Sequence, residues 1–204
     1  MSDCGCGTKQ TNELERKTLI ALLCVNSLMF VAELTMGWLA QSTGLIADSI
    51  DNFADATVYG VSLYVVGKGV LKQARSAQIS GILQIVLGVG VLLEVLRRLI
   101  YGSEPQSLLM FAVGILALLA NVICLKLIWK HREGGVHMRA SWIFSTNDVI
   151  ANLGVIISGV LVATLNSRYP DLIIGTIISI VVVSGGISIL RDAKQTRKNA
   201  MNTA

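Results

Sequence analysis

The chain has 204 residues, of which 53% are hydrophobic and 15% are charged, and its mean hydropathy is +0.65. This composition excludes an ordinary soluble domain, because long apolar runs without charges are typical of membrane spans. The formal net charge of +4 could suit nucleic acid, but most basic residues lie in the tails and between the apolar runs, which indicates a membrane protein and no nucleic-acid partner.

Six apolar runs are long enough to cross a bilayer, since a spanning helix needs about 20 mostly apolar residues. Short polar segments separate them, so successive helices are expected to be antiparallel neighbours. The predicted fold is an all-α membrane protein with one six-helix domain at 18–192, flanked by tails at 1–17 and 193–204. The predicted spans are Thr18–Ala40, Gly44–Val66, Ala77–Tyr101, Ser107–Trp129, Ala140–Leu165 and Leu172–Leu190.

The distribution of positive charge predicts the orientation of these spans. Of the 17 lysines and arginines, all but Arg97, Arg98 and Arg168 lie in the two tails or beside the second and fourth intervening segments. Cytoplasmic segments carry the excess of basic residues, so both termini are predicted to be cytoplasmic. The first 17 residues lack the features of a signal peptide, and the expected location is a bacterial inner (plasma) membrane.

Four aspartates interrupt two of the apolar runs. Asp48, Asp51 and Asp55 lie in the second run, and their spacing of three and four places them on one helical face. Asp148 lies in the fifth run. Each aspartate at the centre of a span costs about 2.5–3.5 kcal/mol, and these two runs contain no lysine or arginine. The compensating partner is therefore predicted to be a metal cation, a proton, or each in turn.

Polar residues around Asp148 extend the predicted site along the fifth run. Ser145 and Asn152 lie three residues before and four after Asp148, on the same helical face. Asn152 could instead form a hydrogen bond between packed helices. Asn147 points roughly 100° away and is expected to bond another helix. Asp48, near the start of its run, could instead cap that helix.

Two segments carry a resemblance to a known family. The sequences ADSIDNFAD at 47–55 and NDVIANLGVIISG at 147–159 resemble the metal-site helices of the cation diffusion facilitator family. The resemblance implies six spans with both termini inside, and efflux of divalent metals, mostly Zn²⁺, in exchange for protons. It also implies that Asp51, Asp55 and Asp148 bind the metal. Phe144 stands where the family has a fourth ligand, which leaves Asn152, Ser145 or water to complete the shell.

Further expectations follow from this resemblance. Most members add a cytoplasmic metal-sensing domain, and the chain is expected to be a member that has the transmembrane domain alone, forming any homodimer through its helices. Metal and protons would compete for the same carboxylates during alternating access. Zn²⁺ is the favoured substrate, and Co, Cd, Fe and Mn are the other metals that could be transported. No resident cofactor is expected. The protein is also not expected to be an enzyme, because the sequence has no nucleophile–base pair, HExxH motif or phosphate loop.

Cysteines and histidines outside the spans are weaker candidate ligands. Cys4 and Cys6 could bind a soft metal, although an unstructured tail explains them equally simply. His131 and His137 lie between the fourth and fifth runs. They could deliver metal to the pore entrance, but isolated histidines in a solvated loop lack a full ligand set.

Polar residues in the first and fourth runs leave alternatives open. Glu33 and Asn26 lie seven residues apart on one face, where they could line the cation route or hydrogen-bond the second span. Asn121 and Cys124 in the fourth run are weaker candidates that are equally consistent with packing. Two other functions remain open, a proton-coupled carrier of organic cations and a membrane metal sensor that transports nothing.

Overall fold

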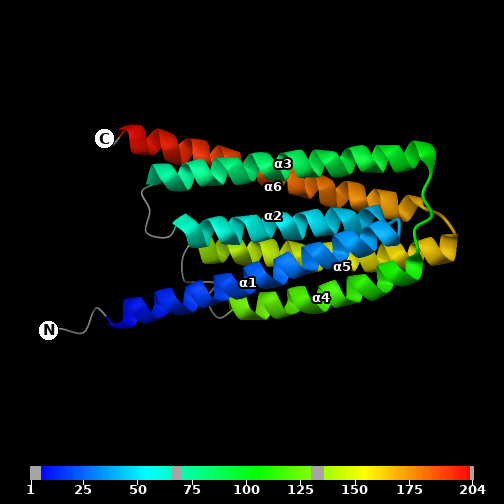
Figure 1. The fold of residues 1–204 in the computed structure, drawn as a ribbon, viewed down its shortest axis with the longest axis horizontal. Coiled ribbons are helices and arrows are strands. Elements are labelled where there is room, and N and C mark those ends of the chain that lie inside the picture. Colours follow the sequence, from blue (N-terminus) through cyan, green and yellow to red (C-terminus); the bar gives the residue numbers. More distant parts are fainter. Residues whose placement is uncertain (1–5, 66–69, 130–135, 203–204) are drawn as a thin grey trace.

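The computed structural model describes residues 6–65, 70–129 and 136–202. These residues form six helices and no strand, which confirms the predicted all-α fold. The helices run alternately up and down, and the two termini lie at the same end of the bundle (Figure 1). We call this the termini end and the opposite end the turn end. The helices are α1 (Cys6–Leu39), α2 (Thr43–Val65), α3 (Val70–Tyr101), α4 (Ser107–Trp129), α5 (Val136–Leu165) and α6 (Tyr169–Asn202).

Five of the six helices are long and apolar enough to cross a membrane, namely all except α2. Every stretch of 18 residues in α2 contains Asp48, Asp51 and Asp55, so this helix is too acidic to pass as an apolar span. Within the described chain, α2 contacts each of the other five helices, whereas no other helix contacts all the rest. The central position keeps the acidic helix away from lipid.

Several helices extend beyond the predicted apolar runs. Helix α1 begins at Cys6 rather than near Thr18, and α6 continues past Leu190 to Asn202. The added segments are rich in lysine, arginine, glutamine and alanine, which are good helix formers. A helix satisfies its own backbone hydrogen bonds, so it can continue where the apolar sequence stops.

The helices divide into a pair and a group of four. Helices α3 and α6 pack along each other, and they contact the rest of the described bundle only through α2 and, for α6, also through α5. Helix α2 pairs with α1, and α4 pairs with α5. In Figure 1 the pair α3 and α6 lies above α2, while α1, α4 and α5 lie level with it or below.

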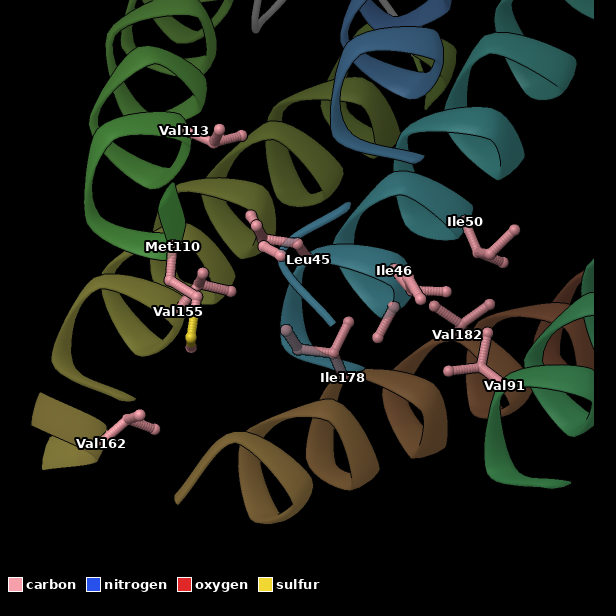
Figure 2. Close-up of a cluster of buried hydrophobic side chains, with 12 residues drawn as sticks. Leu45, Ile46, Ile50, Val91, Met110, Val113, Val155, Val162, Ile178 and Val182 are labelled. Atoms are coloured by element: carbon pink, nitrogen blue, oxygen red, sulfur yellow. The ribbon is translucent and has the colours of Figure 1, made fainter. Parts of the chain in front are cut away.

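One face of α2 packs against the α3 and α6 pair. Ile46 and Ile50 point towards Val91 of α3 and Val182 of α6 in the apolar cluster of Figure 2. This contact fixes the rotation of α2 about its axis. At 100° per residue, the face that carries the aspartates lies on the other side of the helix, towards α1, α4 and α5.

The turn end of α2 is held by a carboxylate from α6. Asp171 is fully buried. Its side chain accepts hydrogen bonds from the Ser42 hydroxyl (2.6 Å), the Thr43 hydroxyl and amide (2.6 Å each) and the Gly44 amide (3.0 Å). Sequence analysis placed Asp171 in a loop, but α6 begins at Tyr169, so Asp171 lies in its first turn. The N-termini of two helices thus share one negative charge, which suits both helix dipoles.

Candidate metal centre

The four residues predicted first for the metal site are all buried in the structure. Asp51, Asp55, Asp148 and Asn152 each expose at most 8% of their surface. The carboxylate of Asp148 on α5 interacts electrostatically with Asp55 and Asp51 on α2. The fold therefore places the acidic residues of the second and fifth spans in one region of the bundle.

Apolar contacts towards the turn end show how α2 and α5 are aligned. Leu45 of α2 and Val155 of α5 belong to the same buried cluster and lie near each other in Figure 2. The two helices are antiparallel, so equal steps from this pair towards the termini end stay at equal depth. These steps pair Asp48 with Asn152 and Asp55 with Ser145, and they bring Asp51 to within one residue of Asp148.

Several buried polar atoms on α5 have no partner. Asp148 Oδ2, Ser145 Oγ and Asn152 Oδ1 are enclosed and make no hydrogen bond within the described structure. The amide group of Asn152 donates to the Asp148 carbonyl within its own helix (2.7 Å), which leaves its oxygen free. Buried polar atoms in folded proteins are nearly always hydrogen-bonded, so a group of exceptions points to an absent ligand.

A tyrosine adjoins one of the carboxylates, and a cysteine packs beside that tyrosine. The Tyr59 hydroxyl donates to Asp55 Oδ2 (3.2 Å), one turn further along α2. Tyr59 and Cys124 of α4 pack in one buried cluster. Sequence analysis left Cys124 as a weaker candidate, equally consistent with packing. The signal that singles it out is its place three residues after Asn121 on the buried face of α4.

The carboxylates stand apart rather than gathered around one point. Among the described residues, no three aspartate, glutamate, cysteine or histidine side chains lie close enough to hold one metal ion. Negative charges in a region of low dielectric repel one another strongly when no cation lies between them. Metal binding at this place would therefore require the facing helices or their side chains to move together.

A second buried polar group joins α1 to α2. The Asn52 amide donates to Glu33 Oε2 (2.9 Å), so Glu33 does hydrogen-bond the second span, which was one of the two predicted alternatives. Glu33 Oε1 and Asp48 Oδ2 are buried without a partner in the described residues. The alternative that Asp48 caps α2 is wrong, because Ser42 and Asp171 occupy that role.

Asn26 and Asn147 differ in their surroundings. Asn26 is fully buried in α1, where its amide donates to the Leu22 carbonyl (2.9 Å) and its oxygen has no partner in the described chain. Asn147 is exposed on α5, away from the face that carries Asp148. Its expected bond to another helix is not formed among the described residues.

The side chains of the cysteines and histidines predicted as auxiliary ligands lie outside the described part of the structure. Cys4 and His131 lie outside the described residues. Cys6 and His137 lie in the first turns of α1 and α5, but their side chains are outside the described part of the structure. The same holds for the Phe144 side chain. Their suggested roles therefore stay predictions.

Comparison with known proteins identifies relatives over most of the chain. The cation efflux transmembrane domain family matches residues 19–74 and 76–196. Zinc transporter ZitB of Yersinia pseudotuberculosis is 20% identical over 190 residues, which cover 87% of this chain and 61% of the relative.

Two other relatives also carry the names of metal transporters. Metal cation efflux system protein CzcD of Cupriavidus metallidurans is 21% identical over 181 residues, covering 83% of this chain and 57% of the relative. Vacuolar zinc transporter ZRC1 of Saccharomyces cerevisiae is 29% identical over 133 residues, covering 58% and 30%. The chain thus spans about three fifths of the length of the bacterial relatives and less of the yeast protein.

Proposed function

Because the chain belongs to the cation efflux family, we propose that it exports divalent metal cations from the cytoplasm in exchange for protons. The transport site is formed by Asp51 and Asp55 on α2 and by Asp148 on α5, with Asn152 and Ser145 beside them. The protein acts as a carrier in the membrane and not as an enzyme.

The unpartnered carboxylate oxygen of Asp148 is the observation that carries this proposal. It is buried opposite the two aspartates of α2, with no hydrogen-bond donor and no basic side chain beside it in the described structure. Ionisable groups inside a membrane protein usually mark an ion or proton pathway. Carboxylate oxygens bind Zn²⁺ and also the harder divalent ions.

Competition between metal and protons accounts for the exchange. The same oxygens bind either a divalent ion or protons, since a metal displaces protons from its ligands. When the site opens to the cytoplasm it loads metal, and when it opens to the other side it releases metal as protons enter. Helix α2 carries two of the ligands and contacts every other helix, so its movement changes access from both sides.

The names of the relatives favour Zn²⁺ as the first substrate to test. Two of them are zinc transporters and one is a metal cation efflux protein. An oxygen site without histidine would also accept Co²⁺, Cd²⁺, Fe²⁺ or Mn²⁺.

Orientation and assembly are part of the same proposal. The two termini lie at one end of the bundle (Figure 1), and the basic residues concentrate towards that end, which supports a cytoplasmic location for both. We place the protein in a bacterial inner membrane, as a homodimer formed through its helices and surrounded by lipid.

Metal flux into proteoliposomes tests this function. Purified protein is reconstituted, a proton gradient is imposed, and entry of Zn²⁺, Co²⁺, Cd²⁺, Fe²⁺ and Mn²⁺ is followed with Asp51→Ala as the control. We expect flux that depends on the gradient and is lost in the variant. Flux of organic cations without metal binding would replace the proposal with an organic-cation carrier, and metal binding without any flux would replace it with a metal sensor.

A further inference from the structure

The buried face of α4 is apolar except at two neighbouring positions. Asn121 and Cys124 lie three residues apart on the face turned into the bundle, and both are fully buried. Both polar atoms of the Asn121 side chain lack a hydrogen-bond partner in the described chain. The buried face consists of Met110, Val113, Gly114, Ala117, Asn121, Cys124 and Ile128.

Contacts between α4 and α5 fix the depth of Cys124. A side chain at Gly114 would contact Val155 and Ile156 of α5, so these positions lie against each other. The helices are antiparallel, and equal steps towards the termini end bring Asn121 and Cys124 to the stretch of α5 between Asp148 and Ser145. The thiol therefore lies at the depth of the proposed metal ligands.

The surroundings of Cys124 connect it to both halves of the site. Cys124 packs in the cluster that contains Tyr59, and the Tyr59 hydroxyl donates to Asp55 (3.2 Å). The thiol also interacts electrostatically with Asp148 and Asp55. Two atoms at the same depth, Asp148 Oδ2 and Ser145 Oγ, are buried and unpartnered in the described structure. The thiol thus lies next to the tyrosine that bonds Asp55, at a depth where buried polar atoms lack partners.

We propose that the Cys124 sulfur is the fourth ligand of the transported metal, together with Asp51, Asp55 and Asp148. This inference rests on the proposed function. Zinc sites favour four ligands, and phenylalanine at position 144 cannot bind metal. Cys124 would supply the ligand that the three aspartates leave missing. The fourth ligand then comes from α4 rather than from α5.

A sulfur ligand determines which metals the site prefers. Thiolate is a soft ligand that favours Zn²⁺ and Cd²⁺, whereas oxygen ligands suit Mn²⁺ and Mg²⁺. When the S–metal bond forms, the S–H bond breaks and its proton passes to water on the side from which the metal entered. The ion also offsets the repulsion between the carboxylates, which allows α2, α4 and α5 to close around it.

Absorption spectroscopy with Co²⁺ tests the sulfur bond directly. The full chain with Cys4→Ser and Cys6→Ser is titrated with Co²⁺ in detergent, so that the N-terminal thiols do not contribute. A cobalt–thiolate bond gives a strong charge-transfer band in the near ultraviolet, which oxygen ligands do not give. We expect this band in the parent protein and its loss in Cys124→Ser and Cys124→Ala. Cys24→Ser is the matched control, because Cys24 is exposed on α1, and it should keep the band.

Calorimetry with Cd²⁺ and Mn²⁺ provides a second readout. In Cys124→Ser we expect Cd²⁺ affinity to fall at least tenfold while Mn²⁺ affinity changes less than threefold. Co²⁺ binding without a charge-transfer band, or equal losses for both metals, would overturn the role of Cys124 and leave the carboxylate site standing. Absence of binding for every divalent ion would overturn the proposed function as well. Circular dichroism of each variant shows whether it is folded.

Discussion

Two buried carboxylates in this bundle have opposite surroundings. Asp171 at the turn end accepts hydrogen bonds from two hydroxyls and two backbone amides of the chain around Thr43. Asp148, midway along α5, has a buried oxygen with no partner in the described structure and three aspartates within electrostatic range. Both are almost completely shielded from solvent.

The difference shows how a carboxylate that stabilises the fold can be distinguished from one that is available to bind an ion or a proton. Burial of a carboxylate is unfavourable in either place, but donors around Asp171 replace the lost water. No donor in the described chain replaces it at Asp148 Oδ2, so we expect this carboxylate to be stabilised when an ion or proton binds. We therefore expect substitutions at the two positions to affect different properties.

The largest expected effect is on transport when a site carboxylate is neutralised. Asp148→Asn or Asp51→Asn should reduce gradient-driven Zn²⁺ flux at least 100-fold, because the ion loses a negatively charged ligand. The thermal midpoint without metal should stay equal or rise, since one repelling charge is removed. Saturating Zn²⁺ at about 100 times its Kd should stabilise the parent by about 2.7 kcal/mol and the variants by less.

Asn147→Ala is the matched control for these substitutions, because Asn147 is exposed and adjoins Asp148 on α5. It should keep both flux and metal stabilisation. Normal flux in Asp148→Asn would contradict the proposed role of the carboxylate.

The next largest effect is on folding when Asp171 is replaced. Asp171→Ala leaves the amides of Thr43 and Gly44 and two hydroxyls without their acceptor, which should lower the free energy of unfolding by about 3–5 kcal/mol. Unfolding in mild detergent measures the loss. Asp171→Asn retains an acceptor oxygen and should lose less. If Asp171→Ala unfolds at the parental midpoint, the hydrogen bonds at the turn end do not stabilise the bundle.

Glu33 should behave between these two extremes, because one oxygen is bonded to Asn52 and the other is free. Glu33→Leu removes one of the two acceptors of the Asn52 amide, which keeps only the Asp48 carbonyl (3.3 Å), and should lower stability by about 1–3 kcal/mol. Glu33→Gln keeps an acceptor for Asn52 and should lose under about 1 kcal/mol. Thermal unfolding of the two variants side by side distinguishes a bonding role from a purely electrostatic one, for which both would behave alike.

The smallest expected effect comes from pH on the loading side. Protons compete with metal for the carboxylates, so acidifying that side should raise the apparent KM for Zn²⁺ by up to about tenfold per pH unit for each proton displaced. The maximal rate at saturating metal should change less. Metal entry into proteoliposomes at several external pH values measures this dependence, because metal is loaded from outside in that assay. A KM independent of pH would contradict shared binding of metal and protons.

Much of the fold was predictable from the sequence because it follows from local chemistry. Long apolar runs gave six helices, and the spacing of three and four placed Asp48, Asp51 and Asp55 on one face. The N-terminal tail was predicted less well, since α1 continues as a helix through polar residues that also suit a coil. The predicted sixth span begins at Leu172, just after Asp171. A polar segment before a span does not reveal which helix it will contact, so the bonds of Asp171 to the start of α2 could not be predicted.

The amino-acid sequence alone shows which chemical groups lie inside the membrane domain, because spans are mostly apolar and acidic residues within them are easily recognised. It could not decide which helices face one another. Only the packing of Ile46 and Ile50 against α3 and α6 (Figure 2) turns the acidic face of α2 towards α1, α4 and α5. That packing also distinguishes Asp171, which meets the start of α2, from Asp148, which meets other carboxylates. Contacts between residues more than a hundred positions apart depend on tertiary structure, for which local spacing carries no information.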